Sequence, residues 1–392
     1  MDIALDDDQI MLRDTAVSFA QGALTKERIR DLEQTADGFD IGVWKEMAQM
    51  GWAAAAFQEQ YGGAETGTLE LGLIVEALGQ GAIPSPMFSS VIESGFVLLD
   101  AGSAAQKDDW LPRIASGDAL MTVALMEANG GLRAQDIRAT IKSSGNGFRI
   151  DGTKAFVRDA GASDAIICLA RSGDRPEDLT MAVVPRDTKG VSLQRMSAAG
   201  GEALWEVKFG GVEVNADSIV GHVGAAWTAA KRLLLRGAAF KSAELVGIGQ
   251  GSLGLTLDYA KVRVQFGKPI GSFQGVQHHC AEMYRDLEVS RLLSWQATGS
   301  LGEGFDGERE VSMAKAKASK AIPALTRTAH QIHGAIAYYR DYPLELYYHR
   351  ALAAQAAYGD AAYHRRALSR LLTSDMNAFR GQDPHELPVH YF

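Results

Sequence analysis

The chain has 392 residues, 46% of them hydrophobic, and a formal net charge of -9 at pH 7. This length suggests two or three domains, with enough apolar residues to bury their cores. Because the chain is acidic and contains no Lys/Arg-rich run, we expect no nucleic-acid partner.

Residues 1–120 are predicted to form an N-terminal helical domain. Acidic residues at positions 6–8 mark the start of a helix, and apolar residues then recur at helical spacing. Further helices are expected over 41–49 and 68–80. The first residues are acidic where a targeting presequence would be basic, so we expect a cytoplasmic protein.

Residues 121–222 are predicted to form a central β-domain. Short β-prone runs alternate here with Gly, Asn and Asp, a texture typical of strands joined by turns. The runs cover 148–157, 165–170, 181–184 and 205–209.

Residues 223–392 are predicted to form a C-terminal helical bundle to about residue 372, followed by a polar tail. No apolar run in the chain approaches the roughly 20 residues of a membrane span, so no membrane association is expected. Only Cys168 and Cys280 are present, which excludes a disulfide framework and a cysteine metal site. The histidines form no ligand pattern, and no metal site is predicted.

A sharp turn interrupts the helical pattern of this last domain at Arg263-Val-Gln-Phe-Gly-Lys-Pro-Ile-Gly-Ser-Phe-Gln274. Two glycines and a proline break the helix and place Arg263, Phe266 and Gln274 around the turn. The segment resembles the Arg-x-x-Phe-Gly-x-x-Ile-x-x-Phe-Gln motif of the acyl-CoA dehydrogenase family. A plain helix-breaking turn with a solvated arginine is the alternative interpretation.

The resemblance covers nearly the whole chain, because the family has the same order of helical, β and helical domains. It implies an α+β fold, FAD bound between the β-domain and the bundle, and a tetramer in which the ADP half of FAD reaches a neighbouring subunit. Arg263 would contact the pyrophosphate, since a guanidinium offers paired donors. Phe266 and Gln274 would line the same cleft.

The resemblance also implies a reaction. Members desaturate an acyl-CoA thioester at its α and β carbons and pass electrons through FAD to an electron-transfer flavoprotein. The acyl group would belong to a fatty acid or a steroid side chain.

A second family motif, Gln-x-x-Gly-Gly-x-Gly, is matched in part from position 331. Gln331 and Gly334 are retained and are implied to approach the dinucleotide. Ala335 and Ala337 replace two glycines, and their methyl groups would alter or fill the ADP pocket. Further on, Arg350 aligns with an arginine of the family, with a structural helix arginine as the alternative.

The β-domain of the family contacts the flavin ring through a Thr-Glu-Pro-x-x-Gly-Ser-Asp loop and a Trp-Ile-Thr strand. Here the segments read Met126-Glu-Ala-Asn-Gly-Gly-Leu-Arg133 and Phe156-Val-Arg158, so two hydroxyl donors are missing. The resemblance implies ring contacts from Met126 and Phe156. Stacking of Phe156 on the ring and burial of Phe156 in the core remain alternatives.

The proton acceptor of the family is missing at its expected positions. Most members carry it in a Tyr-Glu-Gly-Thr segment, where this chain has Gly359 in place of the glutamate. Other members carry it on the preceding helix, where this chain has Gly237. Asp360 and Glu244 remain as candidate bases, although a shift of one residue on a helix turns a side chain by about 100°. Helix capping or a salt bridge is the alternative role for both.

The Gly-Asp-Ala-Ala-x-His pattern at 359–364 resembles the small subunit of two-chain acyl-CoA dehydrogenases, whose related partner carries the acid. The resemblance therefore implies a base-deficient subunit of a heteromer. The alternatives are a self-sufficient enzyme that uses Asp360, a flavin monooxygenase of the same fold, and a structural subunit that binds no flavin. If only the base is missing, Gly359→Glu is expected to raise desaturation activity.

Overall fold

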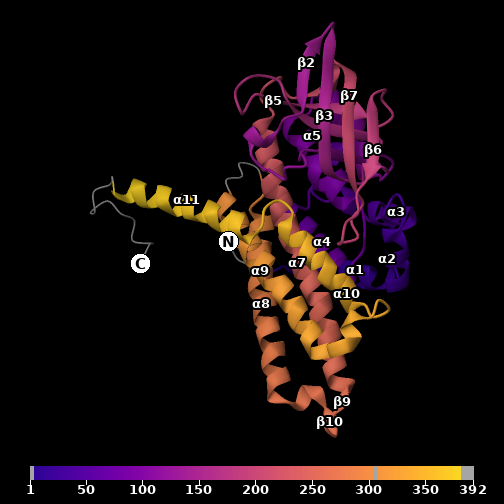
Figure 1. Cartoon of the computed structure of the whole chain (residues 1–392), viewed down its shortest axis with the longest axis vertical. Coiled ribbons are helices and arrows are strands. Elements are labelled where there is room, and N and C mark those ends of the chain that lie inside the picture. The colour runs from indigo at the N-terminus through magenta and orange to yellow at the C-terminus, as the bar shows by residue number, and fades with distance from the viewer. Residues whose placement is uncertain (1–3, 303–306, 381–392) are drawn as a thin grey trace.

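The computed structural model describes residues 4–302 and 307–380 and has three consecutive parts (Figure 1). A group of helices, a β-sheet and a long helical bundle follow one another along the chain, which confirms the predicted fold class. Most of the predicted polar tail, 381–392, lies outside the described residues.

The N-terminal part is helical, as predicted. Its first helix begins at Asp6, whose side chain accepts a hydrogen bond from the Gln9 N–H at 2.8 Å, and the Gln9 side chain accepts one from the Asp6 N–H in return. This capping box explains why the acidic run marks the start. The helices are α1 (Asp7–Gly22), α2 (Lys26–Glu33), α3 (Ile41–Gln49), α4 (Thr68–Gly81), the π-helical segment η3 (Met87–Gly95), α5 (Phe96–Ala101) and α6 (Ala104–Ala115).

The central part is a mixed sheet in which the strand order is β6-β7-β3-β2-β4-β5-β8, and β1 pairs with β4 in parallel. The β-prone runs of the sequence lie on β3, β4, β5 and β7. The strands are β1 (Met121–Ala124), β2 (Thr140–Ser144), β3 (Gly147–Arg158), β4 (Ala165–Arg171), β5 (Leu179–Pro185), β6 (Val191–Arg195), β7 (Leu204–Asn215) and β8 (Ile219–Val220).

Strand β4 shows how the sheet joins the helices. Ile167 and Leu169 belong to the large core that the sheet shares with the helices, whereas Ile166 and Cys168 belong to a second core on the other face of the sheet. Side chains alternate across a strand, so both faces of β4 are buried. One face of the sheet is therefore fixed against the helical parts.

A buried ion pair ties the segment that follows β1 to β3. The Lys154 ammonium lies 3.0 Å from Glu127 Oε1, and the same oxygen accepts hydrogen bonds from the N–H groups of Arg138 and Ala139, both at 2.9 Å. Burial opposes ionisation of Glu127, but Lys154 and the two backbone donors keep its pKa below the usual value.

The C-terminal part is a bundle in which α7, α8 and α9 run side by side, and the β9–β10 hairpin lies at the end opposite the sheet (Figure 1). No Gly or Pro interrupts α11, so this helix continues to Arg380 and the predicted end near residue 372 was wrong. No helix of the described ranges combines the length and the apolar character needed to cross a membrane. The elements are α7 (Trp227–Val262), β9 (Val264–Gln265), β10 (Lys268–Pro269), α8 (Gln274–Gly299), α9 (Glu308–His333), α10 (Leu344–Ala356) and α11 (Ala361–Arg380).

Candidate functional site

The structure divides the predicted site residues into two groups that lie far apart. One group lies where the sheet meets the helices and contains Met126, Phe156, Gly359 and Asp360. The other lies at the far end of the bundle and contains Arg263, Phe266, Gln274, Gln331 and Gly334.

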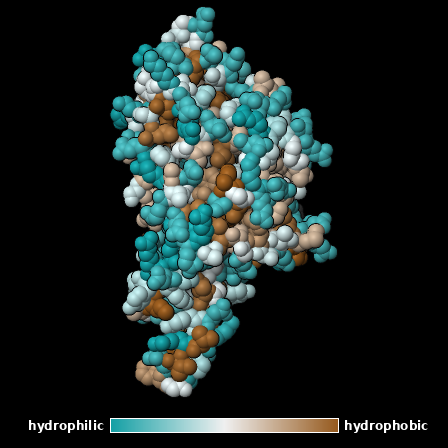
Figure 2. All heavy atoms as spheres, turned by 90° about the vertical axis from the view of Figure 1, so that its right-hand side faces the viewer, coloured by the Kyte–Doolittle hydropathy of each residue, from teal (hydrophilic) through white to brown (hydrophobic). Residues whose placement is uncertain are grey.

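The far end of the bundle is an open surface, which we call the distal arm (residues 259–274 and 331–339). Phe266, at the tip of the β9–β10 hairpin, is 94% exposed, and its neighbours Val262 and Val264 are also exposed. Figure 2 shows this apolar surface at the lower tip of the molecule. Within one chain, therefore, Arg263 and Phe266 do not line a cleft.

Contacts between helices hold the two halves of the distal arm together. The Tyr259 ring at the end of α7 stacks on the His333 ring at the end of α9, with centroids 4.4 Å apart. Gly334 follows with a φ of +68°, a conformation that favours glycine. Ala337 is fully buried in the core of its own chain, so its methyl group does not line an open dinucleotide pocket.

Helix α7 sets the separation between the two groups. Gly237 and Arg263 are 26 residues apart, which corresponds to roughly 40 Å along a helix axis. A single flavin dinucleotide cannot touch both ends of one chain. The distal arm can reach a flavin only if that flavin is bound mainly to another chain.

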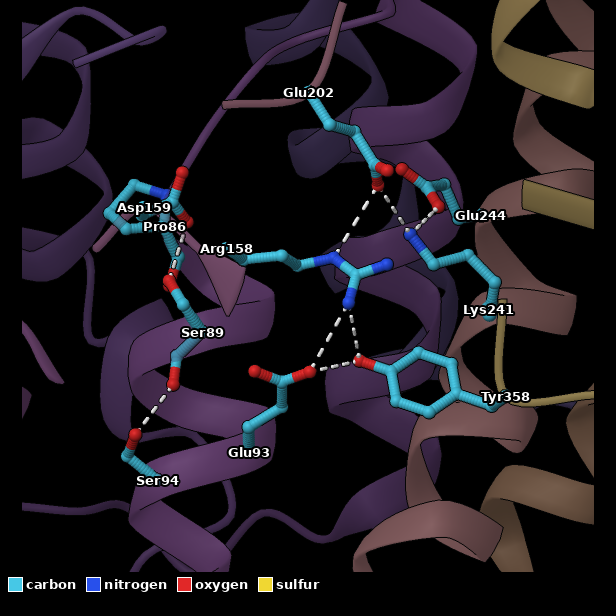
Figure 3. Close-up of polar contacts among 10 residues, drawn as sticks. All are labelled: Pro86, Ser89, Glu93, Ser94, Arg158, Asp159, Glu202, Lys241, Glu244 and Tyr358. Atoms are coloured by element: carbon cyan, nitrogen blue, oxygen red, sulfur yellow. Dashed lines mark hydrogen bonds and ion pairs between the residues drawn. The ribbon is translucent and has the colours of Figure 1, made fainter. Parts of the chain in front are cut away.

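A cluster of buried charges lies where the sheet meets the helices, and we call it the central cluster (Figure 3). Arg158 Nη1 lies 3.3 Å from Glu93 Oε1 and 3.3 Å from the Tyr358 hydroxyl, and Arg158 Nε lies 3.5 Å from Glu202 Oε1. The Tyr358 hydroxyl donates a short hydrogen bond to Glu93. Lys241 Nζ lies 3.2 Å from Glu202 Oε1.

Five separate elements build this cluster, so none of its contacts is local in sequence. They are η3 with Glu93, the end of β3 with Arg158, the loop between β6 and β7 with Glu202, α7 with Lys241, and the connection between α10 and α11 with Tyr358. Arg158 also lies 5.2 Å from the centroid of the Tyr358 ring, a cation–π contact.

The charges of the cluster follow from burial and pairing. Burial raises the pKa of Glu93 and the pKa of Tyr358, so the phenol stays neutral. Burial also opposes ionisation of Glu202, but Arg158 and Lys241 lower its pKa to about 2. The cluster therefore holds two cations, Arg158 and Lys241, against the firmly ionised Glu202 and a second carboxyl group, Glu93, that accepts hydrogen bonds from Arg158 and Tyr358.

Tyr358 occupies the place where a catalytic carboxylate was expected. A Cβ added to Gly237 would lie 2.4 Å from the Tyr358 ring, so the phenol fills the space beside one of the two base positions of the family. Gly359 has a φ of +96°, and its Cβ would instead meet Tyr363 at 2.5 Å. Tyr358 points into the cluster and position 359 does not, which argues against a base introduced at 359.

The two candidate bases have structural roles. Asp360 accepts a hydrogen bond from the Tyr363 N–H at 2.7 Å and caps α11, as the alternative interpretation predicted. Glu244 pairs with Lys241 at 2.6 Å on the rim of the central cluster. Arg350 is also structural, because it donates hydrogen bonds to the Ala82 carbonyl and to Glu33.

Met126 and Phe156 face the cluster across a cavity of only about 20 Å³. Leu234 and Tyr358 line its other side. Pockets that hold small molecules usually measure roughly 300–1,000 Å³. The side chains present therefore leave no space for an isoalloxazine ring between Phe156 and Tyr358.

A cationic groove of about 730 Å³ lies next to this small cavity. The loop that contains Arg133 and Arg138 forms one wall, and the first turns of α11, with Arg366 and Arg370, form the other. Arg133 is neutralised by Asp136 at 3.0 Å. The remaining positive charge suits an anionic ligand.

Asp159, next to Arg158, gives this region a pH-dependent stability. Its carboxyl accepts a hydrogen bond from Ser89 Oγ at 2.5 Å, and burial raises its pKa from 3.8 to about 7. Between these values the folded state holds a proton that the unfolded state releases, so the stabilisation present below the unfolded pKa is lost as pH rises through 7. Relative to Asp159→Asn, we expect the free energy of unfolding of the wild type to fall by up to about 1.4 kcal/mol per pH unit in this interval.

Urea unfolding of both proteins at several pH values on either side of 7 checks this expectation. An Asp159→Asn variant whose stability differs from wild type by the same amount at every pH would contradict it.

Sequence reasoning missed most of the central cluster. Glu93 lies in an apolar run and Lys241 in an Ala/Leu-rich helix, and a charge at such positions is the signal that could have identified them. In the sequence, Arg158 stood out only because it replaces the threonine of the Trp-Ile-Thr strand and so lacks the hydroxyl donor of that residue. The positive φ of Tyr358, +56°, is a backbone feature that only the structure shows.

Comparison with known proteins agrees with this architecture. The descriptions of the N-terminal, middle and C-terminal domains of acyl-CoA dehydrogenases match residues 6–118, 122–212 and 224–373. The acryloyl-CoA reductase (NADH) of Anaerotignum propionicum is 29% identical over 379 residues, which cover 94% of this chain and 95% of the relative.

Two solved structures share the whole fold. Butyryl-CoA dehydrogenase from Megasphaera elsdenii has a TM-score of 0.88 and 26% identity, covering 95% of this chain and 100% of that one. The ChsE4-ChsE5 complex from Mycobacterium tuberculosis has a TM-score of 0.85 and 26% identity, covering 95% and 99%. The chain therefore belongs to the acyl-CoA dehydrogenase family, the oxidoreductases that act on CH–CH groups.

Proposed function

We propose that this chain is the base-deficient subunit of a heteromeric acyl-CoA dehydrogenase and that a related subunit supplies the proton acceptor. The contact between Tyr358 and Gly237 carries the proposal, because a phenol fills the space beside one base position and the other, Gly359, faces Tyr363 instead. A neutral phenol donates a hydrogen bond but does not take up an α-proton. Similarity to the ChsE4-ChsE5 complex supports a partner of the same family.

The distal arm supports a flavin site shared between two chains. Within the described residues, the Arg263 guanidinium makes no hydrogen bond or ion pair, so its paired donors are available for a pyrophosphate. Phe266 and Gln274 lie at the same turn, and Gln331 and Gly334 lie on the adjacent helix end. Since this chain leaves no space for a flavin ring beside Phe156, the FAD that Arg263 contacts would belong mainly to the partner.

We propose an acyl-CoA thioester as the substrate of the heteromer, an electron-transfer flavoprotein as its electron acceptor and a dimer of dimers as its assembly. The names of the acryloyl-CoA reductase and the butyryl-CoA dehydrogenase support the thioester. The exposed apolar surface of the distal arm supports the assembly, because such a surface usually marks an interface.

The test compares the tagged chain purified alone with the complex that it forms with a co-expressed related subunit. We expect acyl-CoA-dependent dye reduction by the complex and none by the isolated chain. In the complex, Arg263→Ala is expected to weaken FAD binding at least tenfold and so to lower the FAD content after dialysis, because loss of a charge-assisted bidentate contact costs roughly 1.5–3 kcal/mol.

Lys261→Ala is the matched control for Arg263→Ala. Lys261 is an exposed cation two residues earlier and, among the residues that the structure describes, pairs only with the exposed Asp258, at 3.3 Å. Its loss is expected to leave the FAD content unchanged. Turnover by the isolated chain would contradict the proposal, as would equal FAD loss in both variants.

A further inference from the structure

The central cluster occupies the space that a flavin ring needs in a chain of this family. Phe156 and Met126, the residues expected against the ring, instead enclose about 20 Å³ together with Tyr358 and Glu93. We infer that Arg158, held by Glu93, Glu202 and Tyr358, acts as an internal plug that closes this chain's own flavin-ring site. This inference rests on the proposed function, because it assumes that the chemistry takes place in the partner.

The backbone directs Arg158 inward. Strand β3 shifts register against β7 between Lys154 and Val157, and Phe156, within the shifted segment, has a φ of +59°. Asp159, directly after the plug residue, has a φ of +50°. Bulges of this kind re-aim a side chain, and two left-handed residues are tolerated only where the surroundings fix them.

Pairing retains the guanidinium in this position. Its side chain is 10% exposed and touches two carboxylates, the Tyr358 hydroxyl and the Tyr358 ring. A buried cation is stable only with such partners, and removing one of them leaves the others unpaired. A neutral aromatic ring inserted here would have to break these contacts and bury the charges without partners.

One oxygen of Glu93 identifies this residue, together with Arg158, as the one to replace in a test. Glu93 Oε2 is buried and has no hydrogen-bond partner in the described part of the chain, and Glu93 lines the small cavity next to Phe156. The other Glu93 oxygen holds Arg158 and Tyr358. Replacing Glu93 and Arg158 together therefore removes the plug and leaves Glu202 paired with Lys241.

The test is the double variant Glu93→Leu/Arg158→Ser. Titration of the isolated chain into lumiflavin, followed by flavin fluorescence, is expected to show saturable quenching with at least tenfold higher affinity than the wild type. The control is Glu127→Leu/Lys154→Met, which removes another buried ion pair, in the sheet, whose two residues do not line the cavity. Circular dichroism and thermal melting verify that all three proteins are folded.

Two results would overturn the plug. One is a folded double variant that binds lumiflavin no better than the control. The other is that the isolated wild-type chain binds one flavin per chain. The titration of the wild type tests this even if the double variant does not fold. Flavin binding by the wild type without turnover would overturn the plug but not the proposed function, whereas turnover by the isolated wild type would overturn the proposed function.

Discussion

Replacing Gly359 by glutamate is expected to destabilise the protein and to add no desaturation activity. Gly359 has a φ of +96°, and a Cβ there would meet the Tyr363 ring at 2.5 Å and His364 at 3.1 Å. A left-handed conformation costs a non-glycine residue roughly 1–2 kcal/mol, and overpacking adds roughly 1–3 kcal/mol. We therefore expect the free energy of unfolding to fall by about 2–5 kcal/mol, measured by urea unfolding.

Gly224→Glu is the matched control. Gly224 has a φ of +81° and no atom within 4 Å of its added Cβ, so only the backbone strain is tested there. The same substitution at Gly359 should cost clearly more. A gain of activity by Gly359→Glu, without loss of stability, would show that position 359 faces the substrate and that the placement of Tyr358 is wrong.

Replacing Lys315 by methionine is expected to lower the free energy of unfolding by about 1–3 kcal/mol, the usual cost of leaving buried hydrogen-bonding groups without their partner. The fully buried Lys315 ammonium donates to the carbonyls of Ala354 (3.2 Å), Gln355 (3.0 Å) and Gly359 (2.9 Å). It thereby closes the carboxyl end of α10 and fixes the connection that presents Tyr358.

Burial lowers the pKa of Lys315 to about 7, so charging this amine opposes folding, and the comparison is made well above that pH, where the penalty on the wild type is smaller. Lys317→Met is the control. Lys317 lies two residues further along α9, is partly exposed and, within the described residues, pairs only with Asp286 at 2.9 Å. Its loss should cost less than about 1 kcal/mol. Equal losses in both variants, measured by urea unfolding, would contradict the role assigned to Lys315.

The sequence was sufficient for the order of the three parts. The helical spacing near residue 12 and β-prone runs such as 165–170 are local patterns. They predict the secondary structure correctly because the apolar residues of each element are buried on a predictable face. The turn from Arg263 to Gln274 was found for the same reason, since Gly and Pro act locally. Its exposure was not predictable, because exposure depends on what another chain covers.

The interior of the site could not be predicted in the same way. Glu93, Arg158 and Glu202 come from three distant segments, and no spacing rule relates their positions. Which side chain at 358–360 points inward depends on two consecutive positive φ angles, at Tyr358 and Gly359. In this connection the side chain that points into the central cluster is therefore the Tyr358 phenol, whereas Asp360 caps α11.

The bare Phe266 tip has a consequence for the life of the protein in the cell. A newly made copy shows this ring, together with Val262 and Val264, to water until another polypeptide covers it. Copies made in excess of the proposed partner subunit should therefore aggregate or be degraded.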